Sequence, residues 1–351
     1  MASGVKTLSV RAPGGGYDVL LGQGLLAQLP ELLKERGLAT RTAVVTNDTL
    51  APLYGASFVD ALADAFLVRV PDGEQHKNLD TLSTIFENLV AGGLGRDGLV
   101  VALGGGVIGD MAGLAAATYM RGVKLVQVPT SLLAMVDASV GGKVAVDLPA
   151  GKNLVGAFKQ PDLVVVDASV LDTLPAAELR AGLAEVVKAG LIADPTLLDT
   201  LEGDWPRLDV IRRALEVKIE VVAADPYEDD VRAHLNLGHT FAHAIEVCSN
   251  YATRHGEAVA VGLVAALRLS ARLGLAQQSL GERIEALLTH LGLPTRHHID
   301  SVEALWDAMS RDKKARTGQR RFVLLRDAGQ VEVVSDVRRD DVLAVLEELR
   351  I

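Results

Sequence analysis

The sequence predicts an α/β domain with a mostly parallel sheet over residues 1–174, followed by a mostly α-helical domain over residues 175–351. Three observations support this fold class. Short valine-rich runs alternate with helical segments in the first half, helical periodicity dominates the second half, and the change falls at Leu174-Pro175. The chain has 351 residues, 49% of them hydrophobic, which is enough to form two cores.

Five short, continuously apolar runs in the first half are typical of buried parallel strands, namely 42–46, 66–70, 99–103, 124–128 and 163–166. Helices are expected between them at 50–62, 79–91 and 110–120. Both faces of such a sheet are covered by helices. In the second half, six helices are expected at 177–190, 210–223, 237–248, 257–273, 280–291 and 301–310, and five prolines punctuate this half at 175, 195, 206, 226 and 294. Two short strands are expected at 321–325 and 330–334.

Composition excludes several classes of protein. The net charge of −10 argues against a general nucleic-acid binder but leaves room for a local basic pocket. Cys248 is the single cysteine, so no intramolecular disulfide forms. The first residues lack the pattern of a secretory signal, and the apolar run Val259–Leu267 is about half the length that spans a bilayer. We therefore expect a cytoplasmic protein without a membrane span.

A glycine-rich loop follows the expected strand at 99–103. Gly104, Gly106 and Gly109 fit the G-x-G-x-x-G spacing, and a helix of small residues follows them. Glycine allows the backbone to approach a phosphate, and the helix start adds free N–H groups. The acid of the usual Rossmann fingerprint is missing about 20 residues further on. The loop therefore favours nucleotide binding, in an unusual Rossmann-like arrangement, over a simple packing turn.

A polar cluster, Asp72 to Lys77, follows the expected strand at 66–70. A carboxylate there would accept ribose hydroxyls, and Lys77 would offset phosphate charge. A solvated turn before a helix that starts at Asn78 explains the same residues equally well.

Histidines and one acid in the second half suggest a divalent metal. His239 and His243 are four residues apart on an expected helix, and His255 follows at the start of the next one. Glu185 lies in an apolar helical run, with Lys188 one turn further on. Two or three histidines with one glutamate make the ligand set of a catalytic zinc site. Satisfied core or surface histidines remain the alternative, whereas the missing H-E-x-x-H pattern disfavours a metalloprotease.

A glycine- and lysine-rich stretch, 137–156, is expected to be a mobile loop that meets a phosphate or carboxylate. It lacks the Walker A pattern. Lys218, Arg232 and the Lys313-Lys314 pair add positive charge in the second half. Together these side chains favour an anionic substrate.

Six ordered motifs resemble those of the 3-dehydroquinate synthases: PDGEQHK (71–77), GGGVIGD (104–110), PTSLLAMVDASVGGK (129–143), GLAEVVK (182–188), LNLGHTFAH (235–243) and HGEAV (255–259). The resemblance covers almost the whole chain. It implies an NAD-binding domain, a helical metal- and substrate-binding domain, and an active site in the cleft between them. It also implies a homodimer, with Arg121 supplied across the interface.

The resemblance assigns roles to individual residues. The metal, zinc or cobalt, would be held by Glu185, His239 and His255, so His243 becomes a substrate contact. The NAD-binding residues would be Asn47, Asp72, Glu74, Lys77, Gly105, Gly106, Val107, Asp110, Thr130, Ser131, Lys143, Lys152 and Thr173. The catalytic residues would be Lys188, His243, Asp137, Lys143 and Asn236. The substrate would be bound by Lys152, Asn153, Lys218, Arg232, Lys314 and Arg121.

The implied reaction converts 3-deoxy-D-arabino-heptulosonate 7-phosphate to 3-dehydroquinate and phosphate. It proceeds by transient oxidation, phosphate elimination, reduction, ring opening and aldol closure, with NAD regenerated. Three alternatives remain open: a related cyclase that acts on sedoheptulose 7-phosphate or glucose 6-phosphate, a metal-dependent polyol dehydrogenase, and an inactive NAD-binding regulator.

Overall fold

The computed structural model describes residues 4–228, 230–311 and 320–351. Its contacts divide the chain into two compact units, Met1–Pro175 (unit 1) and Ala176–Ile351 (unit 2).

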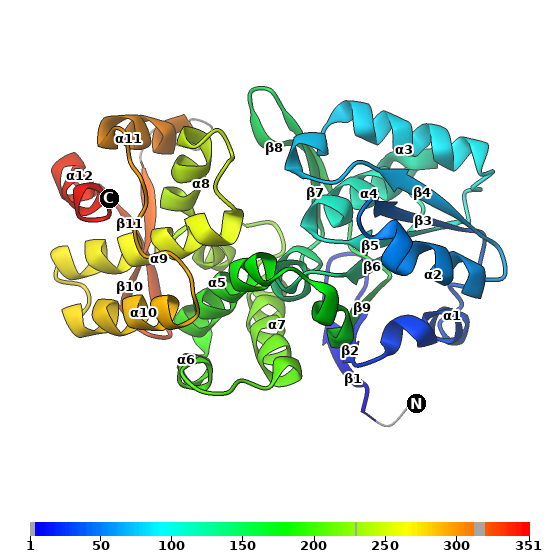
Figure 1. Ribbon diagram of the computed structural model, residues 1–351, viewed down its shortest axis with the longest axis horizontal. Coiled ribbons are helices and arrows are strands. Elements are labelled where there is room, and N and C mark those ends of the chain that lie inside the picture. The colour runs from blue at the N-terminus through cyan, green and yellow to red at the C-terminus, as the bar shows by residue number, and fades with distance from the viewer. Residues whose placement is uncertain (1–3, 229, 312–319) are drawn as a thin grey trace. The chain divides into compact units, whose positions relative to one another are not determined.

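Unit 1 is built on a seven-stranded sheet within its described residues, in the order β1-β2-β9-β6-β5-β3-β4 (Figure 1). Every neighbouring pair is parallel except β1 with β2. The strands are β1 (Lys6–Val10), β2 (Tyr17–Gly22), β3 (Thr42–Asn47), β4 (Ala65–Val70), β5 (Leu99–Gly104), β6 (Lys124–Pro129) and β9 (Leu163–Asp167). The predicted, mostly parallel sheet is confirmed.

Helices cover both faces of this sheet. Alternate residues of β5 enter two different hydrophobic clusters: Val100 faces helices α3 (Leu79–Ala91) and α4 (Gly106–Thr118), whereas Val101 faces α1 (Leu25–Glu35) and α2 (Ala56–Ala61). Burial on both faces explains why these strands are continuously apolar and do not alternate.

The strand order creates a switch point. The chain passes from β3 outward to β4 and then returns to β5, on the other side of β3. In open α/β sheets, ligands bind beyond the carboxyl ends of the strands at such a reversal. The glycine loop follows β5 directly, so it lies at this point.

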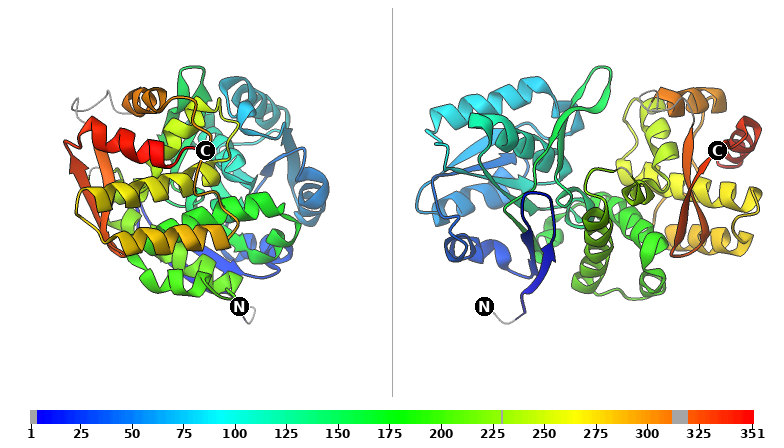
Figure 2. Two further views of the ribbon diagram at one scale, coloured as in Figure 1. Left: turned by 60° about the vertical axis from the view of Figure 1, so that its left-hand side comes forward. Right: turned by 180° about the vertical axis from the view of Figure 1, so that it is seen from behind.

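The stretch at 137–156, expected to be a mobile loop, is largely an antiparallel hairpin of β7 (Lys143–Leu148) and β8 (Gly151–Phe158). The hairpin projects from unit 1 in Figure 2. The first two residues of the stretch, 137 and 138, belong to the π-helical turn Ala134–Ala138, which precedes β7. The prediction of a loop was wrong because Val144 and Val146 are buried against α3 and α4, and this packing fixes the strands.

Unit 2 is mostly helical, as predicted, and its described residues include a two-stranded antiparallel sheet among the helices (Figure 2). Its elements are α5 (Ala176–Ala193), α6 (Pro195–Leu201), α7 (Arg207–Ala224), α8 (His239–Cys248), α9 (His255–Arg272), α10 (Gln278–His290), α11 (Val302–Arg311), β10 (Arg321–Asp327), β11 (Gln330–Ser335) and α12 (Arg339–Glu348). Helix α9 contacts α5, α8, α10, α12 and β10, so it forms the centre of the unit. Over the three described ranges, no helix is both long and apolar enough to span a bilayer.

Several predicted helices begin a few residues from their expected starts, and two of these differences bear on the site. The helix expected at 237–248 starts only at His239, because Gly238 adopts a left-handed φ of 78° and separates it from the 3-10 helix Val231–Asn236. The helix expected at 110–120 starts already at Gly106, inside the glycine loop. Both differences move the helix start to the motif that was expected to bind a ligand.

Candidate active site

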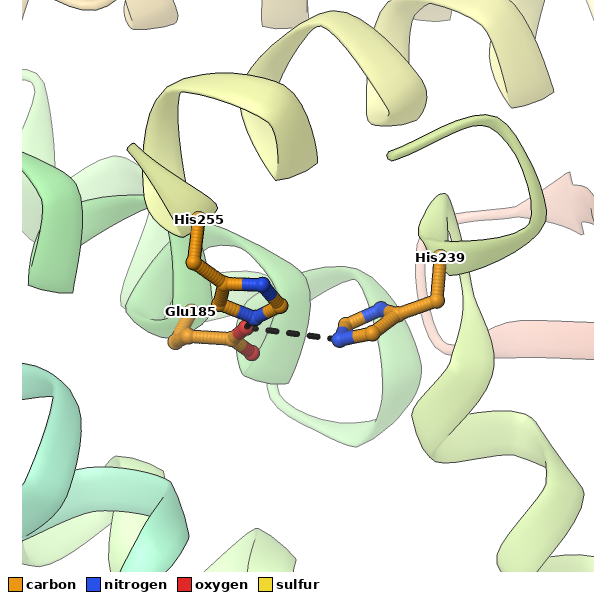
Figure 3. A group of neighbouring side chains, drawn as sticks. All are labelled: Glu185, His239 and His255. Atoms are coloured by element: carbon orange, nitrogen blue, oxygen red, sulfur yellow. Dashed lines mark hydrogen bonds and ion pairs between the residues drawn. The ribbon is translucent and has the colours of Figure 1, made fainter. Parts of the chain in front are cut away.

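Three side chains from three different helices of unit 2 converge: Glu185 from α5, His239 from α8 and His255 from α9 (Figure 3). The Glu185 Oε1 atom lies 3.3 Å from Nε2 of His255 and 3.5 Å from Nε2 of His239. One ligand atom from each residue lies within 4.8 Å of the others. The structure thus brings together the three residues named as metal ligands.

The three triad residues meet because α9 packs closely against α5 and against the start of α8, with glycines at the points of contact. A Cβ added to Gly256, next to His255, would fall 2.0 Å from the Ala181 carbonyl oxygen of α5. A Cβ added to Gly262 of α9 would fall 2.2 Å from the Gly238 carbonyl oxygen, just before α8. Only glycine allows this approach, so α9 comes near enough to both neighbours for the side chains to meet.

The triad fits a divalent metal. Ligand atoms at the usual zinc distances in a tetrahedral site lie about 3.3 Å from each other, and the two carboxylate–imidazole distances are 3.3 and 3.5 Å. Two nitrogens and one carboxylate oxygen are three protein ligands, which leaves a fourth position for substrate or water. His243 stands outside the group of converging ligand atoms, and its ring meets that of His239 edge to face.

Buried charges surround the triad. Burial raises the pKa of Glu185, but Lys188 and the two histidines outweigh it, so this pKa lies well below its ordinary range. Lys188 is 3% exposed and forms an ion pair with Glu185 Oε2. Burial, followed by the Lys188 charge, lowers the pKa of His239 to about 3. Burial also lowers the pKa of His255, but the hydrogen bonds that its ring donates to Glu185 and Glu246 outweigh burial and raise this pKa to about 9.

The remaining unit 2 candidates among the described residues lie on α7, on α8 and in the 3-10 helix Val231–Asn236 between them. Arg232 is 2% exposed and donates to the Pro226 carbonyl oxygen. The Asn236 amide donates to Glu228 Oε1 at 2.7 Å. Lys218 is half-buried on α7. Lys314, like Lys313, lies outside the described residues.

In unit 1 the glycine loop forms a tight strand-to-helix turn. A Cβ on Gly104 would fall 2.5 Å from Cβ of Ile108, so the turn needs glycine there. Gly105 precedes α4 without a side-chain cap, and Gly106 and Val107 form its first turn. The uncapped N–H groups and the helix dipole make this turn suitable for a phosphate.

Predicted NAD contacts gather at the carboxyl ends of β3, β4 and β5. The Asn47 amide donates to Asp72 Oδ1 at 2.7 Å. Lys77 is 5% exposed, and its Nζ lies 2.6 Å from Asp110 Oδ2 and 2.5 Å from Asn153 Oδ1. Burial raises the pKa of Asp110 to about 6, even though the Lys77 charge lowers it.

The hairpin reaches the same cluster, because Lys152 Nζ of β8 lies 3.2 Å from Glu74 Oε1. Lys143 is exposed at the first residue of β7. Asp137 is half-buried in the π-helical turn before it.

Three further candidates follow β6 and β9, and one lies elsewhere. Thr130 donates its backbone N–H to Gly104, and Ser131 lies beside Gly105. Thr173 shares a hydrogen bond with Tyr54, with 2.5 Å between the two oxygens. Arg121, in contrast, is exposed after α4, a helix of 13 residues and thus about 20 Å long. It is at the opposite end of α4 from the glycine loop.

Sequence reasoning missed two acids that contact candidate site residues in the structure. Glu246 is 2% exposed, and its Oε1 lies 3.4 Å from Nδ1 of His255. The sequence does carry a sign of this burial, because Glu246 is an acid within the otherwise apolar run Ala244–Val247, on the helix that carries His239. Glu228, the partner of Asn236, gave no such signal, because it lies in an acidic turn typical of solvent exposure.

Unit 1 has a loop suited to a phosphate at the switch point of its parallel sheet, and unit 2 has a triad of two histidines and one carboxylate. These two features define the class of protein as enzymes that combine nucleotide binding with a divalent metal. Comparisons with known proteins agree. Residues 67–181 match the sequence model of the 3-dehydroquinate synthase N-terminal domain, and residues 182–315 match that of the C-terminal domain. The chain belongs to the 3-dehydroquinate synthase family.

Named relatives cover nearly the whole chain. The 3-dehydroquinate synthase of Neisseria meningitidis serogroup C (strain 053442) is 45% identical over 97% of this chain and 98% of its own length. A solved 2-epi-5-epi-valiolone synthase from Streptomyces hygroscopicus, with NAD+ and Zn2+ bound, is 31% identical, covers 95% of this chain and 96% of its own, and has a TM-score of 0.88. A solved 2-deoxy-scyllo-inosose synthase, complexed with carbaglucose-6-phosphate, NAD+ and Co2+, is 27% identical. The match covers 98% of this chain and 100% of that chain, also with a TM-score of 0.88.

Proposed function

We propose that this chain catalyses the conversion of 3-deoxy-D-arabino-heptulosonate 7-phosphate to 3-dehydroquinate and phosphate. The observation that carries the proposal is the convergence of Glu185, His239 and His255 in a chain 45% identical, over 97% of its length, to a named 3-dehydroquinate synthase. NAD and one divalent metal, zinc or cobalt, are the cofactors, as in the two related cyclases solved with NAD+ and Zn2+ or Co2+.

Unit 1 would hold the NAD. The uncapped start of α4 would face the pyrophosphate, with Gly105, Gly106 and Val107 allowing a close approach. Asn47 and Asp72, already joined by a hydrogen bond, would orient a ribose through their remaining hydrogen-bonding capacity. Lys77 and Asp110 would add a buried charged pair beside the phosphates. The other contacts proposed are Glu74, Thr130, Ser131, Lys143, Lys152 and Thr173.

Unit 2 would hold the metal and much of the substrate. Bound NAD supplies reversible hydride acceptance, and a bound divalent metal supplies Lewis-acid polarisation of a substrate hydroxyl. Lys188, held by Glu185, would orient hydroxyl groups near the triad. Arg232 and Lys218 would bind anionic groups, and Arg is suited to a carboxylate because its guanidinium binds in a bidentate manner. His243 would move a proton near the leaving phosphate.

The proposal keeps the other residues that the family resemblance names. Asp137, Lys143 and Asn236 would act in catalysis, and Lys152, Asn153, Lys314 and Arg121 would contact the substrate. Arg121 would act from the second subunit of a homodimer, since it lies at the far end of α4 from the loop of its own chain. Light scattering tests the dimer, and a cytoplasmic location completes the proposal.

A cyclase that acts on sedoheptulose 7-phosphate is the second candidate, favoured by the likeness to the valiolone synthase. That substrate lacks the carboxylate for which Arg232, Lys218 and Asn236 are suited. Incubation with each sugar phosphate and measurement of the released phosphate separates the two. Release from the heptulosonate phosphate is expected, and release from sedoheptulose 7-phosphate alone would overturn the proposal.

A further inference from the structure

Glu246 is a buried carboxylate for which the proposed reaction has no direct use. It lies on α8, seven residues after His239, and is 2% exposed. Burying a carboxylate costs several kcal/mol unless charged or polar partners compensate it. Its Oε1 lies 3.4 Å from Nδ1 of His255, which belongs to a different helix. A buried carboxylate that contacts a triad member is a candidate for a role at that residue.

The two ring nitrogens of His255 have different neighbours. Nε2 lies 3.3 Å from Glu185 Oε1, on the side where the ligand atoms converge, and Nδ1 lies against Glu246. His239 is arranged in the same way: its Nε2 is directed to Glu185, and its Nδ1 lies 3.2 Å from the Leu237 carbonyl oxygen. Each histidine therefore has an acceptor at Nδ1, which would hold the remaining ring proton when a metal takes the place of the proton at Nε2.

From this arrangement we infer that Glu246 is a positioning residue that holds the His255 ring and its tautomer for a divalent cation. The inference rests on the proposed metal site and deepens it. Helix α8 would then support the site twice, through His239 as a ligand and through Glu246 as the partner of a ligand on α9. A carboxylate is a stronger acceptor than the carbonyl that serves His239, so it also makes the imidazole a better donor to the metal.

The test measures metal affinity in the full-length chain. Metal-free protein is titrated with Zn2+ in competition with a coloured chelator, and separately with Co2+ to record the visible ligand-field spectrum. Glu246→Gln keeps the shape of the side chain and removes its charge. We expect Zn2+ to bind about 10- to 100-fold more weakly, with a changed Co2+ spectrum and an unchanged affinity for NAD.

Glu257→Gln is the matched control. Glu257 is also an acid near His255 on α9, but it pairs with Arg254 at 3.2 Å. This variant should bind both metals like the parent chain. In a His255→Ala background, Glu246→Gln should have no further effect on metal affinity, whereas a purely structural role would give an equal loss in both backgrounds.

Each outcome decides one question. If the parent chain binds Zn2+ tightly and Glu246→Gln binds it equally well, the role of Glu246 is overturned while the metal site stands. If the parent chain does not bind Zn2+ or Co2+, the proposed metal site itself fails. Should Glu246→Gln not fold by circular dichroism, Glu246→Asp replaces it, since the shorter carboxylate withdraws from Nδ1. Normal affinity of that variant would equally refute the inference.

Discussion

Asp110, in the first turns of α4, should make unit 1 less stable as the pH rises. Its carboxylate meets Lys77 at 2.6 Å, yet burial raises the pKa of Asp110 from the ordinary 3.8 to about 6. A group whose pKa is higher in the folded chain binds its proton more tightly there. The folded state is therefore favoured below pH about 3.8, and this contribution is lost as the pH rises through 6.

The size of the effect follows from the shift. A rise from 3.8 to about 6 corresponds to about 3 kcal/mol. The Asp110 side chain remains 20% exposed, so solvent screens part of this and the value is an upper limit. Asp110→Asn removes the titration. Over the interval from pH 4 to pH 7, the shift allows a change of at most about 2.4 kcal/mol in the difference in unfolding free energy between the parent chain and this variant, so with screening we expect this difference to fall by about 1 to 2 kcal/mol.

Urea unfolding, followed by circular dichroism in the absence of NAD and metal, measures this difference. Both tryptophans, Trp205 and Trp306, lie in unit 2, so their fluorescence reports that unit separately. Asp60→Asn, at an exposed position of α2, is the control and should leave the pH profile unchanged. Parallel profiles for the parent chain and Asp110→Asn would refute the reasoning that burial outweighs the Lys77 charge.

Three other perturbations address the second unit. Gly256→Ala should weaken Zn2+ binding by about tenfold or more, because the added Cβ would fall 2.0 Å from a backbone oxygen of α5. Gly281→Ala is the control: its added Cβ would meet no atom nearer than 3.8 Å, so this variant should bind Zn2+ normally in the same titration. Ser270→Ala should cost about 1–3 kcal/mol in urea unfolding, because the buried Leu325 N–H loses its acceptor at 3.0 Å; an unchanged midpoint would contradict this. Chelation of the metal should abolish phosphate release, and added Zn2+ or Co2+ should restore it. Glu185→Gln should stay folded but remain inactive with either metal. Activity that survives chelation would exclude the metal role.

Strands buried on both faces were the easiest part of the fold to predict. Their valine-rich runs are continuous, and β3 to β6 and β9 were all found from them. Strand β1 escaped notice because it is an edge strand with mostly exposed residues. Strand β2 and helix α1 were also missed, although β2 is largely buried and α1 buries three leucines. The β7–β8 hairpin was read as a loop, because its glycines and lysines hide the few valines that pack on α3 and α4.

Local sequence patterns do not predict which three residues form the metal triad. Spacing within α8 suggested His239 with His243, since residues four apart share a helix face. The structure joins His239 to residues of two other helices, and glycine contacts such as Gly256 with α5 make that possible. Such contacts are tertiary, so no local rule predicts them. The family resemblance named the same three residues that the structure brings together, because ordered motifs carry tertiary information that spacing within one helix lacks.

The most direct test of the account is a mass balance on the purified protein loaded with Zn2+ and a substoichiometric amount of NAD. With 3-deoxy-D-arabino-heptulosonate 7-phosphate in excess, the account predicts equal amounts of phosphate and 3-dehydroquinate, many turnovers per NAD, and no accumulation of NADH. NADH that accumulates in proportion to consumed substrate would indicate a dehydrogenase and contradict the account, as would the absence of phosphate release.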